Sequence, residues 1–259
     1  MSTWAARVTI LGSGTSHGVP MIGCRCPVCQ SADPRDQRSR PSIYIQFDDG
    51  TSVLVDTTPD LRMQALRHGV ERVDAILFTH CHADHVMGLD DVRRFNVLQG
   101  GRPITCYGDD HTIENLRRIF SYAFDAADHG GGLPRIQLQR LAGPLSIAGQ
   151  TIVPVKVWHG PRLILGYRVG GFAYLTDCNR IPDESWPLLQ QLDTLVIDAV
   201  RHRPHGTHFN VAGALAVIER LAPRRAYLTH ICHDLPHAVT NGQLPAGVEL
   251  AYDGLVLEI

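Results

Sequence analysis

The sequence lacks the features that would place the protein in or on a membrane. No apolar stretch approaches the roughly 20 residues needed to span a bilayer, and residues 1–7 lack the architecture of a signal peptide. The formal net charge of −2 gives no general attraction to nucleic acid or to anionic lipid. We therefore expect a cytoplasmic protein and expect neither a membrane nor a nucleic-acid partner.

The sequence also lacks an even number of cysteines. It contains no internal repeat, low-complexity tract or linker. The odd count of seven cysteines argues against a secreted disulfide scaffold. A chain of 259 residues with 44% hydrophobic and 19% charged residues is ordinary for a soluble globular protein. Because no boundary is visible, the sequence favours a single domain over residues 1–259.

Many short strands with a few helices between them indicate a layered α/β fold. The strands are expected at 7–11, 42–47, 52–55, 74–79, 103–107, 136–141, 151–157, 163–169, 172–176, 194–198, 226–229 and 248–257. Helical patterns lie at 59–68, 87–98, 110–120, 184–192 and 210–221. Residues 121–135, which include a Gly-Gly-Gly run, are interpreted as either a mobile loop over one edge or an ordinary connection.

The most informative segment is Thr79-His80-Cys81-His82-Ala83-Asp84-His85, directly after an apolar strand. It places four potential metal ligands (His80, His82, Asp84 and His85) within six residues. Imidazole and carboxylate suit zinc and its first-row neighbours. Two histidines one residue apart can share one ion, while Asp84 and His85 turn toward a second.

Three more potential ligands follow apolar strands further along the chain. His159 follows the strand 151–157, Asp177 follows 172–176 and His230 follows 226–229. Taken alone, each is more typical of an ordinary strand-end loop residue. In this order, together with the first motif, they resemble the metallo-β-lactamase superfamily of binuclear hydrolases over nearly the whole chain.

That resemblance implies an αββα sandwich, two sheets face to face with helices outside and the metals at one edge. It implies one divalent ion on His80, His82 and His159, a second on Asp84, His85 and His230, and Asp177 as the bridge. Asp84 would also orient the attacking water. The ions would be Zn or Mn, and two such ions can activate a water and clamp a phosphoryl group for in-line attack.

A second cluster, Cys24-Arg25-Cys26-Pro27-Val28-Cys29, places three thiols within six residues. In a reducing compartment such a cluster more often binds a metal than forms a disulfide, and three thiolates leave one tetrahedral position open. His233 is the candidate fourth ligand, and Cys232 is the alternative. We expect a small N-terminal zinc knuckle holding one structural Zn.

The two sites together resemble the phosphoribosyl 1,2-cyclic phosphate phosphodiesterases of phosphonate metabolism, in the ribonuclease Z-like branch of the superfamily. This resemblance assigns the knuckle zinc to Cys24, Cys26, Cys29 and His233, and it assigns a catalytic role to His208 as proton donor to the leaving alkoxide. His202 and His205 compete with His208 in the same loop. The partner is then a small phosphodiester, and the family precedent allows a homodimer.

The segment Gly12-Ser13-Gly14-Thr15-Ser16-His17-Gly18 also follows a strand, but it runs into the cysteine cluster and not into a helix. It therefore does not predict a dinucleotide site. Its small residues are expected to let the backbone approach the metal edge, where Thr15, Ser16 or His17 could touch substrate.

Three alternatives to a small-molecule phosphodiesterase remain open. A tRNA-processing endonuclease of the ribonuclease Z type needs an inserted Gly/basic-rich arm, and none is visible. A non-enzymatic protein like pyrroloquinoline quinone biosynthesis protein B would share the knuckle but have a degraded binuclear motif, whereas here every ligand position is filled. A β-lactamase or thioesterase stays possible because a metal core alone does not choose the substrate.

Overall fold

The computed structural model describes residues 6–125, 132–147 and 149–259 and contains two seven-stranded mixed sheets. The first sheet has the order β14-β1-β2-β3-β4-β5-β6 and the second β13-β12-β11-β10-β9-β8-β7. The strands of the first sheet are β1 (Ala6–Gly12), β2 (Ser42–Phe47), β3 (Ser52–Val55), β4 (Ala75–Leu77), β5 (Ile104–Gly108), β6 (Ile136–Arg140) and β14 (Val256–Glu258). Those of the second are β7 (Leu145–Ile147), β8 (Gln150–His159), β9 (Arg162–Val169), β10 (Phe172–Leu175), β11 (Thr194–Asp198), β12 (Arg225–Thr229) and β13 (Val248–Leu250).

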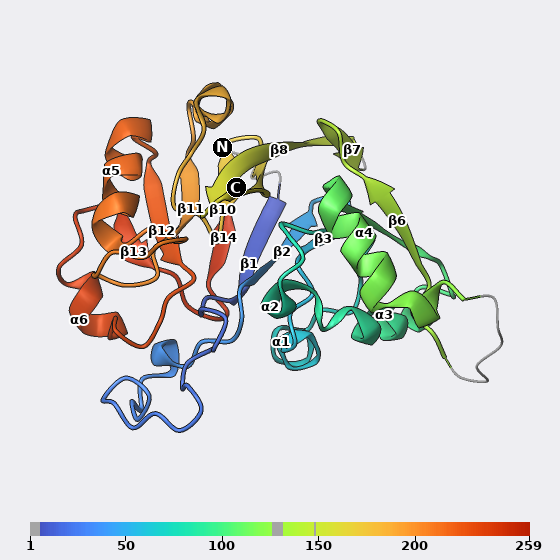
Figure 1. The fold of residues 1–259 in the computed structure, drawn as a ribbon, viewed down its shortest axis with the longest axis horizontal. Helices are drawn as coiled ribbons and strands as arrows, with labels where there is room; N and C mark the ends of the chain where they lie inside the picture. Colours follow the sequence, from blue (N-terminus) through green and yellow to red (C-terminus); the bar gives the residue numbers. More distant parts are fainter. Residues whose placement is uncertain (1–5, 126–131, 148) are drawn as a thin grey trace.

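Helices cover the two outer faces, so the architecture is the expected αββα sandwich (Figure 1). The α-helices are α1 (Leu61–His68), α2 (Ala83–Val86), α3 (Val92–Leu98), α4 (Asp110–Ile119), α5 (Val211–Leu221) and α6 (His237–Asn241). Short 3-10 helices are η1 (Pro34–Asp36), η2 (Leu89–Asp91), η3 (Ser121–Ala123) and η4 (Asp183–Leu189). Helices α1 to α4 lie beside the first sheet, and α5 and α6 beside the second.

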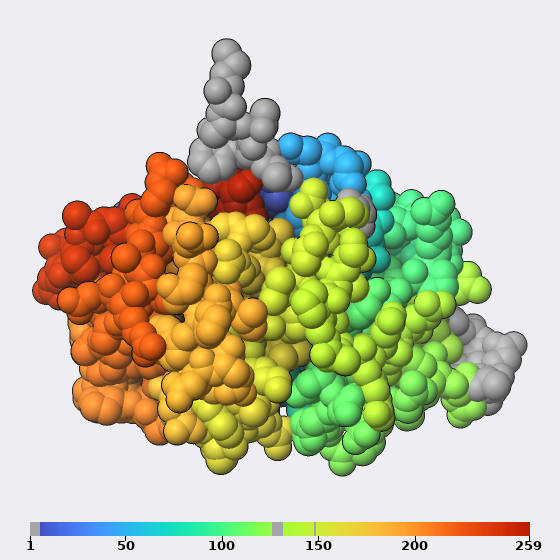
Figure 2. Space-filling view, turned by 90° about the horizontal axis from the view of Figure 1, so that it is seen from above, coloured from blue at the N-terminus to red at the C-terminus, as the bar shows by residue number. Residues whose placement is uncertain are grey.

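Successive side chains of a strand point to opposite faces of its sheet, so the two sheets and the helices form three hydrophobic layers. In β3, Val53 and Val55 face the second sheet, whereas Leu54 packs in the cluster under α1, α3 and α4. In β11, Val196 joins the layer between the sheets and Leu195 packs toward α5. Both sheets are therefore buried on both faces, which explains their continuous apolar strands. Seen from above, the green segment lies at one end of the molecule and the orange and red C-terminal segment at the other (Figure 2).

Three sequence expectations about elements need correction. The segment 248–257 is two strands in different sheets, β13 and β14, because the chain turns at Asp253-Gly254 with Gly254 at φ 93°. The helix expected at 184–192 is the 3-10 helix η4, and Pro187 inside it removes a backbone donor. The pattern at 87–98 is split into η2 and α3.

The loop expected at 121–135 begins with η3, and its residues 126–131 lie outside the described part of the chain. Within the ranges that the structure describes, no helix combines the length and apolar character needed to cross a membrane.

Candidate binuclear metal centre

The carboxyl ends of parallel strands from both sheets bring the predicted ligands to one edge. Strands β3 and β4 are parallel in the first sheet, and β10, β11 and β12 are parallel in the second. His80 follows β4, Asp177 follows β10 and His230 follows β12, while β8 ends at His159. Asp84 and His85 lie in α2, one turn beyond His80. Carboxyl strand ends are where open α/β sheets bind ligands.

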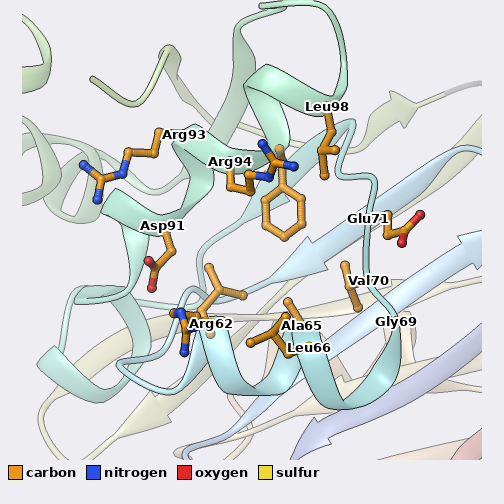
Figure 3. A pocket seen from close by; sticks show the side chains of 12 residues that line it. Arg62, Ala65, Leu66, Gly69, Val70, Glu71, Asp91, Arg93, Arg94 and Leu98 are labelled. Carbon is orange, nitrogen blue, oxygen red and sulfur yellow. The ribbon is translucent and has the colours of Figure 1, made fainter. Parts of the chain in front are cut away.

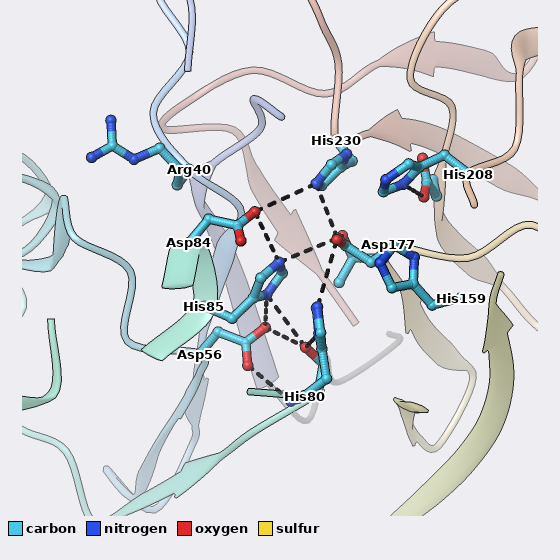
Figure 4. Close-up of polar contacts among 12 residues, drawn as sticks. Arg40, Asp56, His80, Asp84, His85, His159, Asp177, His208 and His230 are labelled. Carbon is cyan, nitrogen blue, oxygen red and sulfur yellow. Dashed lines mark hydrogen bonds and ion pairs between the residues drawn. The ribbon is translucent and has the colours of Figure 1, made fainter. Parts of the chain in front are cut away.

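Two groups of potential ligand atoms result, each with all its atoms within 4.8 Å of one another. One group is His80, His82 and His159, and the other is Asp84, His85, Asp177 and His230. Asp177 lies between them (Figure 4). Its Oδ1 is 3.3 Å from His85 Nε2 and 3.1 Å from His230 Nε2, and its Oδ2 is 3.8 Å from His80 Nε2. One carboxylate thus presents one oxygen to each group.

Several atoms at the centre are buried without a hydrogen bond among the described residues. They are Nε2 of His80, His85 and His230 and Oδ2 of Asp84. A buried polar atom with no partner costs free energy. Because all four atoms converge on the same small region and are nitrogen or oxygen donors, the residues fit divalent metal ions.

The electrostatics also favour cations at this place. Burial would raise the pKa of Asp177, but His230 and His85 beside it hold that pKa well below its usual value. In the other group, burial lowers the pKa of His159 to about 4 and that of His80 well below its ordinary value. Burial alone would lower the pKa of His230 and of His85, but Asp177 raises that of His230 to about 10 and that of His85 well above its usual value. The group that contains Asp177 therefore favours positive charge, which a divalent ion would supply in place of the protons.

Outer hydrogen bonds orient the ligand rings. Asp56 Oδ2 lies 2.7 Å from His85 Nδ1 and accepts from the Thr79 hydroxyl at 2.8 Å. The same hydroxyl lies 3.0 Å from His80 Nδ1, and the Thr207 carbonyl lies 3.1 Å from His159 Nδ1. Such contacts fix the tautomer and would leave each Nε2 available to hold a metal ion. The sequence reasoning missed Asp56; its only signal was an Asp directly after an apolar strand.

Backbone strain is concentrated at the same edge. Asp56, Asp177 and His230 have φ values of 65°, 55° and 59°, in the left-handed region. For a residue other than glycine, this backbone conformation costs about 1–3 kcal/mol. Strain held at three strand ends around one cluster is typical of a functional site.

The loop after β11 distinguishes His208 from its two competitors. His208 Nδ1 lies 2.7 Å from Oδ2 of the buried Asp198, and its ring stacks on His230 at 4.6 Å between centroids. A ring nitrogen of His208 lies within 4.8 Å of donor atoms of His159 and Asp177. His205 is exposed and its Nδ1 contacts Thr207 of its own loop, and His202 is also exposed. Asp198 was a second residue that the sequence reasoning missed.

The three knuckle thiols surround one imidazole nitrogen. His233 Nδ1 lies 3.2, 3.4 and 3.5 Å from the Sγ atoms of Cys24, Cys26 and Cys29. Spacings of about 3.5 Å are what tetrahedral Zn–S and Zn–N bonds require. The backbone N–H of Cys29 helps lower the pKa of Cys26 to about 7, which favours a thiolate. Cys232 instead accepts from the Asp234 N–H and is not in this group.

Buried Arg38 joins the knuckle segment to the loop that carries His230 and His233. Its guanidinium donates to the carbonyls of Cys232 at 2.8 Å and Leu235 at 2.6 Å and pairs with Asp36 at 2.7 Å. Nearby, Gly14 forms a bridge with Ile231, and a Cβ added to Gly14 would lie 2.8 Å from the Arg38 carbonyl. A glycine is therefore needed where this loop reaches the metal edge.

Two hollows in the molecule differ in volume and in the residues that line them. A cavity of about 290 Å³ is lined by His208 together with Thr15, Ser16 and His17 of the N-terminal loop. A larger groove of about 490 Å³ lies between α1 and α3, lined by Arg62 and Phe95 among others (Figure 3). Neither hollow is lined by a residue of the two ligand groups, but His208, whose ring stacks on that of His230, lines the smaller one. The smaller cavity therefore adjoins the metal edge, and the larger groove does not.

Comparison with known proteins gives a match to a family model and several solved structures of similar fold. The model of the β-lactamase superfamily domain matches residues 51–231. A diphosphatase from the PhnP family superposes with a TM-score of 0.92 at 47% identity, covering 98% of each chain. Zn(2+)-bound PqqB from Methylobacterium extorquens has a TM-score of 0.78 at 22% identity, covering 98% of this chain and 100% of PqqB. The short form of human tRNase Z has a TM-score of 0.68 at 19% identity, covering 97% and 98%.

At those lower identities, the last two structures show a shared fold alone. Among curated proteins, an octanoyltransferase from Porphyromonas gingivalis is 36% identical over 253 residues, which is 96% of this chain and 51% of that protein. The chain therefore spans about half the length of this relative. Coenzyme PQQ synthesis protein B from Methylobacterium radiotolerans is 28% identical over 312 residues, which is 98% of this chain and all of that protein.

Proposed function

This chain belongs to the β-lactamase superfamily and, within it, to the PhnP family, and on this basis we propose that it hydrolyses a small, cyclic phosphodiester such as phosphoribosyl 1,2-cyclic phosphate. The chain is a metal-dependent hydrolase, as its similarity to the PhnP-family diphosphatase indicates. That relative cleaves a phosphorus centre, which favours phosphoryl over acyl chemistry for the shared edge.

The observation that carries the proposal is the position of Asp177 between the two ligand groups. We assign one divalent ion to His80, His82 and His159, a second to Asp84, His85 and His230, and Asp177 as the bridge. When bound, two such ions, Zn or Mn, supply Lewis acidity for the phosphoryl oxygens and make a water nucleophilic near neutral pH.

The chain's own residues then position the reacting groups. Asp84 Oδ2, 3.4 Å from His85 Nε2 and without a hydrogen bond, is placed to orient the attacking water. His208 is placed at the edge of both groups to give a proton to the leaving alkoxide. Asp198 holds the His208 ring through Nδ1, which leaves Nε2 for the substrate.

We assign the third ion, a structural Zn, to Cys24, Cys26, Cys29 and His233. Since His233 follows His230 by three residues, this ion would stabilise the loop that carries a catalytic ligand. Binding free energy at such a site is also folding free energy.

Two features weigh against RNA as the substrate. The chain has no inserted Gly/basic-rich arm, and its formal net charge is −2. Binding of a folded tRNA depends on many phosphate contacts made by Lys and Arg. A PqqB-like role without catalysis is disfavoured because every ligand position is filled.

A small organic diphosphate is the second candidate substrate, because the relative at 47% identity is a diphosphatase. The same two-metal clamp can act on either bond, since both reactions place water in line with a phosphorus–oxygen bond.

A substrate panel tests the proposal directly. Purified protein with matched salt and metal should cleave phosphoribosyl 1,2-cyclic phosphate and bis(p-nitrophenyl) phosphate, with the cyclic diester exceeding precursor tRNA in kcat/KM. Phosphate monoesters should be poor substrates because a dianionic phosphoryl group resists attack by an anionic nucleophile. Site-specific cleavage of precursor tRNA without turnover of either diester would establish the endonuclease instead, and a preference for the organic diphosphate would establish the second candidate.

A further inference from the structure

Asp253, in the turn between β13 and β14, carries a carboxylate that the chemistry at the metal edge does not use. Only 4% of its side chain is exposed. Its Oδ1 accepts from the N–H and the hydroxyl of Ser13, at 2.9 and 2.8 Å. Its Oδ2 accepts from the N–H and the hydroxyl of Ser39, at 2.8 and 2.6 Å. One carboxylate therefore joins two segments that lie 240 and 214 residues away in the sequence.

Hydrogen bonds, more than an ion pair, stabilise this carboxylate. Arg67 Nη1 lies 4.0 Å from Asp253 Oδ2 and its side chain is 56% exposed, so this pair contributes little. Burial raises the pKa of Asp253, whereas the donors of Ser39 and Ser13 lower it. A buried charge costs free energy unless it is hydrogen-bonded. All four hydrogen bonds leave the turn, so the carboxylate fixes the position of two distant loops and not the turn alone.

The loop that Asp253 holds binds the backbone of Ile231. The Ser13 carbonyl accepts from the Ile231 N–H at 2.9 Å, and the Thr15 N–H donates to the Ile231 carbonyl at 3.2 Å. The Ser39 carbonyl accepts from the N–H of the intervening Gly14 at 2.8 Å, so both serines that contact Asp253 hold this short segment. Both backbone polar groups of Ile231 are thereby paired with the loop. Ile231 directly follows the candidate ligand His230.

His230 depends on its backbone for orientation more than the other buried histidines of the metal edge do. His80, His85 and His159 each have a contact for Nδ1 within 3.1 Å. Among the described residues, His230 Nδ1 has no hydrogen-bond partner, and the ring contact of His230 is its stacking on His208 at 4.6 Å. Its φ of 59° also lies in the left-handed region. The surrounding structure must hold such a conformation in place, and the nearest support is the pairing of the next residue with the N-terminal loop.

We propose that Asp253 is a positioning residue for the metal centre and that it acts through Ser13 and Ile231 to hold His230 in place for the second divalent ion. This inference rests on the proposed function, because it requires that ion. Groups that orient metal ligands usually contact the ligand ring, and their loss costs about 10- to 100-fold in metal affinity. Here the support reaches the ring through the backbone. The first ion, assigned to His80, His82 and His159, does not depend on this path.

Asp253→Asn tests the proposal with little change in side-chain size. The amide replaces one accepting oxygen by an NH₂ group, which cannot accept from a serine N–H or hydroxyl. Wild-type holoprotein and the variant are titrated with a chelator, and the Mn²⁺ or Zn²⁺ that each retains is counted by elemental analysis. The second ion should be lost at a chelator concentration about 10- to 100-fold lower in the variant. Anomalous diffraction at that concentration should show the first ion still bound.

Asp74 provides the matched control, because its Oδ2 accepts from the N–H and the hydroxyl of Ser52 at 2.9 and 3.4 Å in the same way. This pair lies at the amino ends of β3 and β4, whereas the candidate ligands follow carboxyl ends. Asp74→Asn should lower the melting temperature and leave the retention of both edge ions unchanged. In a background of His230→Ala, Asp253→Asn should weaken the second ion no further, since Asp253 acts through that histidine.

Ser13→Ala keeps the test decisive if Asp253→Asn does not fold. It removes the hydroxyl that donates to Asp253 and keeps the backbone contacts, so it should weaken the second ion in the same direction but less. Wild-type retention of the second ion in both variants would overturn the inference alone. Equal weakening of both edge ions would also overturn it, because Asp253 would then act on the fold as a whole. A wild type that retains only one edge ion would overturn the proposed binuclear centre as well.

Discussion

Asp198 Oδ2 lies 2.7 Å from His208 Nδ1, and the same oxygen accepts from the Cys178 N–H at 2.7 Å. Asp198 ends β11 and is fully buried, whereas His208 lies ten residues later in the loop beside the candidate metal ligands. The pair therefore connects the rigid sheet to a side chain that can reach substrate. Because His208 Nδ1 is held by Asp198, we assign His208 a role in proton transfer and not in metal binding.

His208→Ala should reduce kcat by roughly 10²–10⁴-fold, the range for loss of a positioned acid, while the metal content stays at the wild-type value. Steady-state kinetics on the cyclic diester and elemental analysis of the same preparation measure both quantities. His205→Ala is the matched control and should keep most of the turnover of the cyclic diester. If His205→Ala loses turnover and His208→Ala does not, the assignment within this loop is wrong.

Asp198→Asn should lower kcat by about 10- to 100-fold, because an amide no longer holds the His208 ring in the same tautomer. If Asp198 acts through His208, the double variant Asp198→Asn/His208→Ala should be no slower than His208→Ala alone. Multiplicative losses in this cycle would show that the two residues act independently.

Cys24→Ser should remove one metal ion per chain and lower the melting temperature, because a thiolate zinc site contributes its binding free energy to folding. Cys232→Ser is the control, since the Cys232 sulfur contacts the Asp234 N–H and not the knuckle. Elemental analysis and thermal unfolding measure the two effects. Equal metal content in Cys24→Ser and the wild type would exclude the knuckle assignment, and loss of an ion in Cys232→Ser would make Cys232 a ligand.

The buried His237 should make the fold sensitive to acid. Burial, with the charges of Arg35 and Arg38, lowers its pKa to about 4, and its Nε2 accepts from the Asn241 amide at 3.1 Å. An unfolded histidine takes up a proton near pH 6.5. Between pH 6.5 and 4 the unfolded chain therefore binds more protons at this residue, so the free energy of unfolding falls as the pH falls.

His237→Gln keeps a neutral acceptor for Asn241 and should flatten this part of the pH dependence. Urea unfolding of the metal-replete protein at pH 7, 5.5 and 4.5 measures it. The exposed His202→Gln should follow the wild-type slope. Identical slopes for His237→Gln and the wild type would contradict the role given to His237.

The meeting of the candidate ligands at one edge was predictable because each combines a potential metal-binding side chain with a strand end, and parallel strands bring their carboxyl ends together. Asp56 and Asp198 were not, since a lone Asp after an apolar strand is common and only the folded sheet shows which ring it contacts. The cavity beside His208 could not be predicted for the same reason. Its lining residues Thr15 and His208 are 193 residues apart, and the loop after β12 joins their loops: the Thr15 N–H donates to the Ile231 carbonyl, and the Cys232 N–H donates to the Val200 carbonyl.

The errors in the predicted strand boundaries have local causes. The apolar pattern of 248–257 continues through a turn, so it hides the passage from one sheet to the other. Strand β7 is three residues long and only partly buried, which leaves too few alternating positions to recognise. Both errors lie away from the metal edge, and the site prediction was unaffected by them.

The binuclear centre is the central claim, and anomalous diffraction from crystals loaded with Mn²⁺ or Zn²⁺ tests it most directly. We predict two peaks at the sheet edge, about 3.5–4 Å apart, one within bonding distance of His80, His82 and His159 and the other of Asp84, His85 and His230, with one Asp177 oxygen toward each. A single peak at this edge after full metal loading, or two peaks that Asp177 does not contact, would contradict the account.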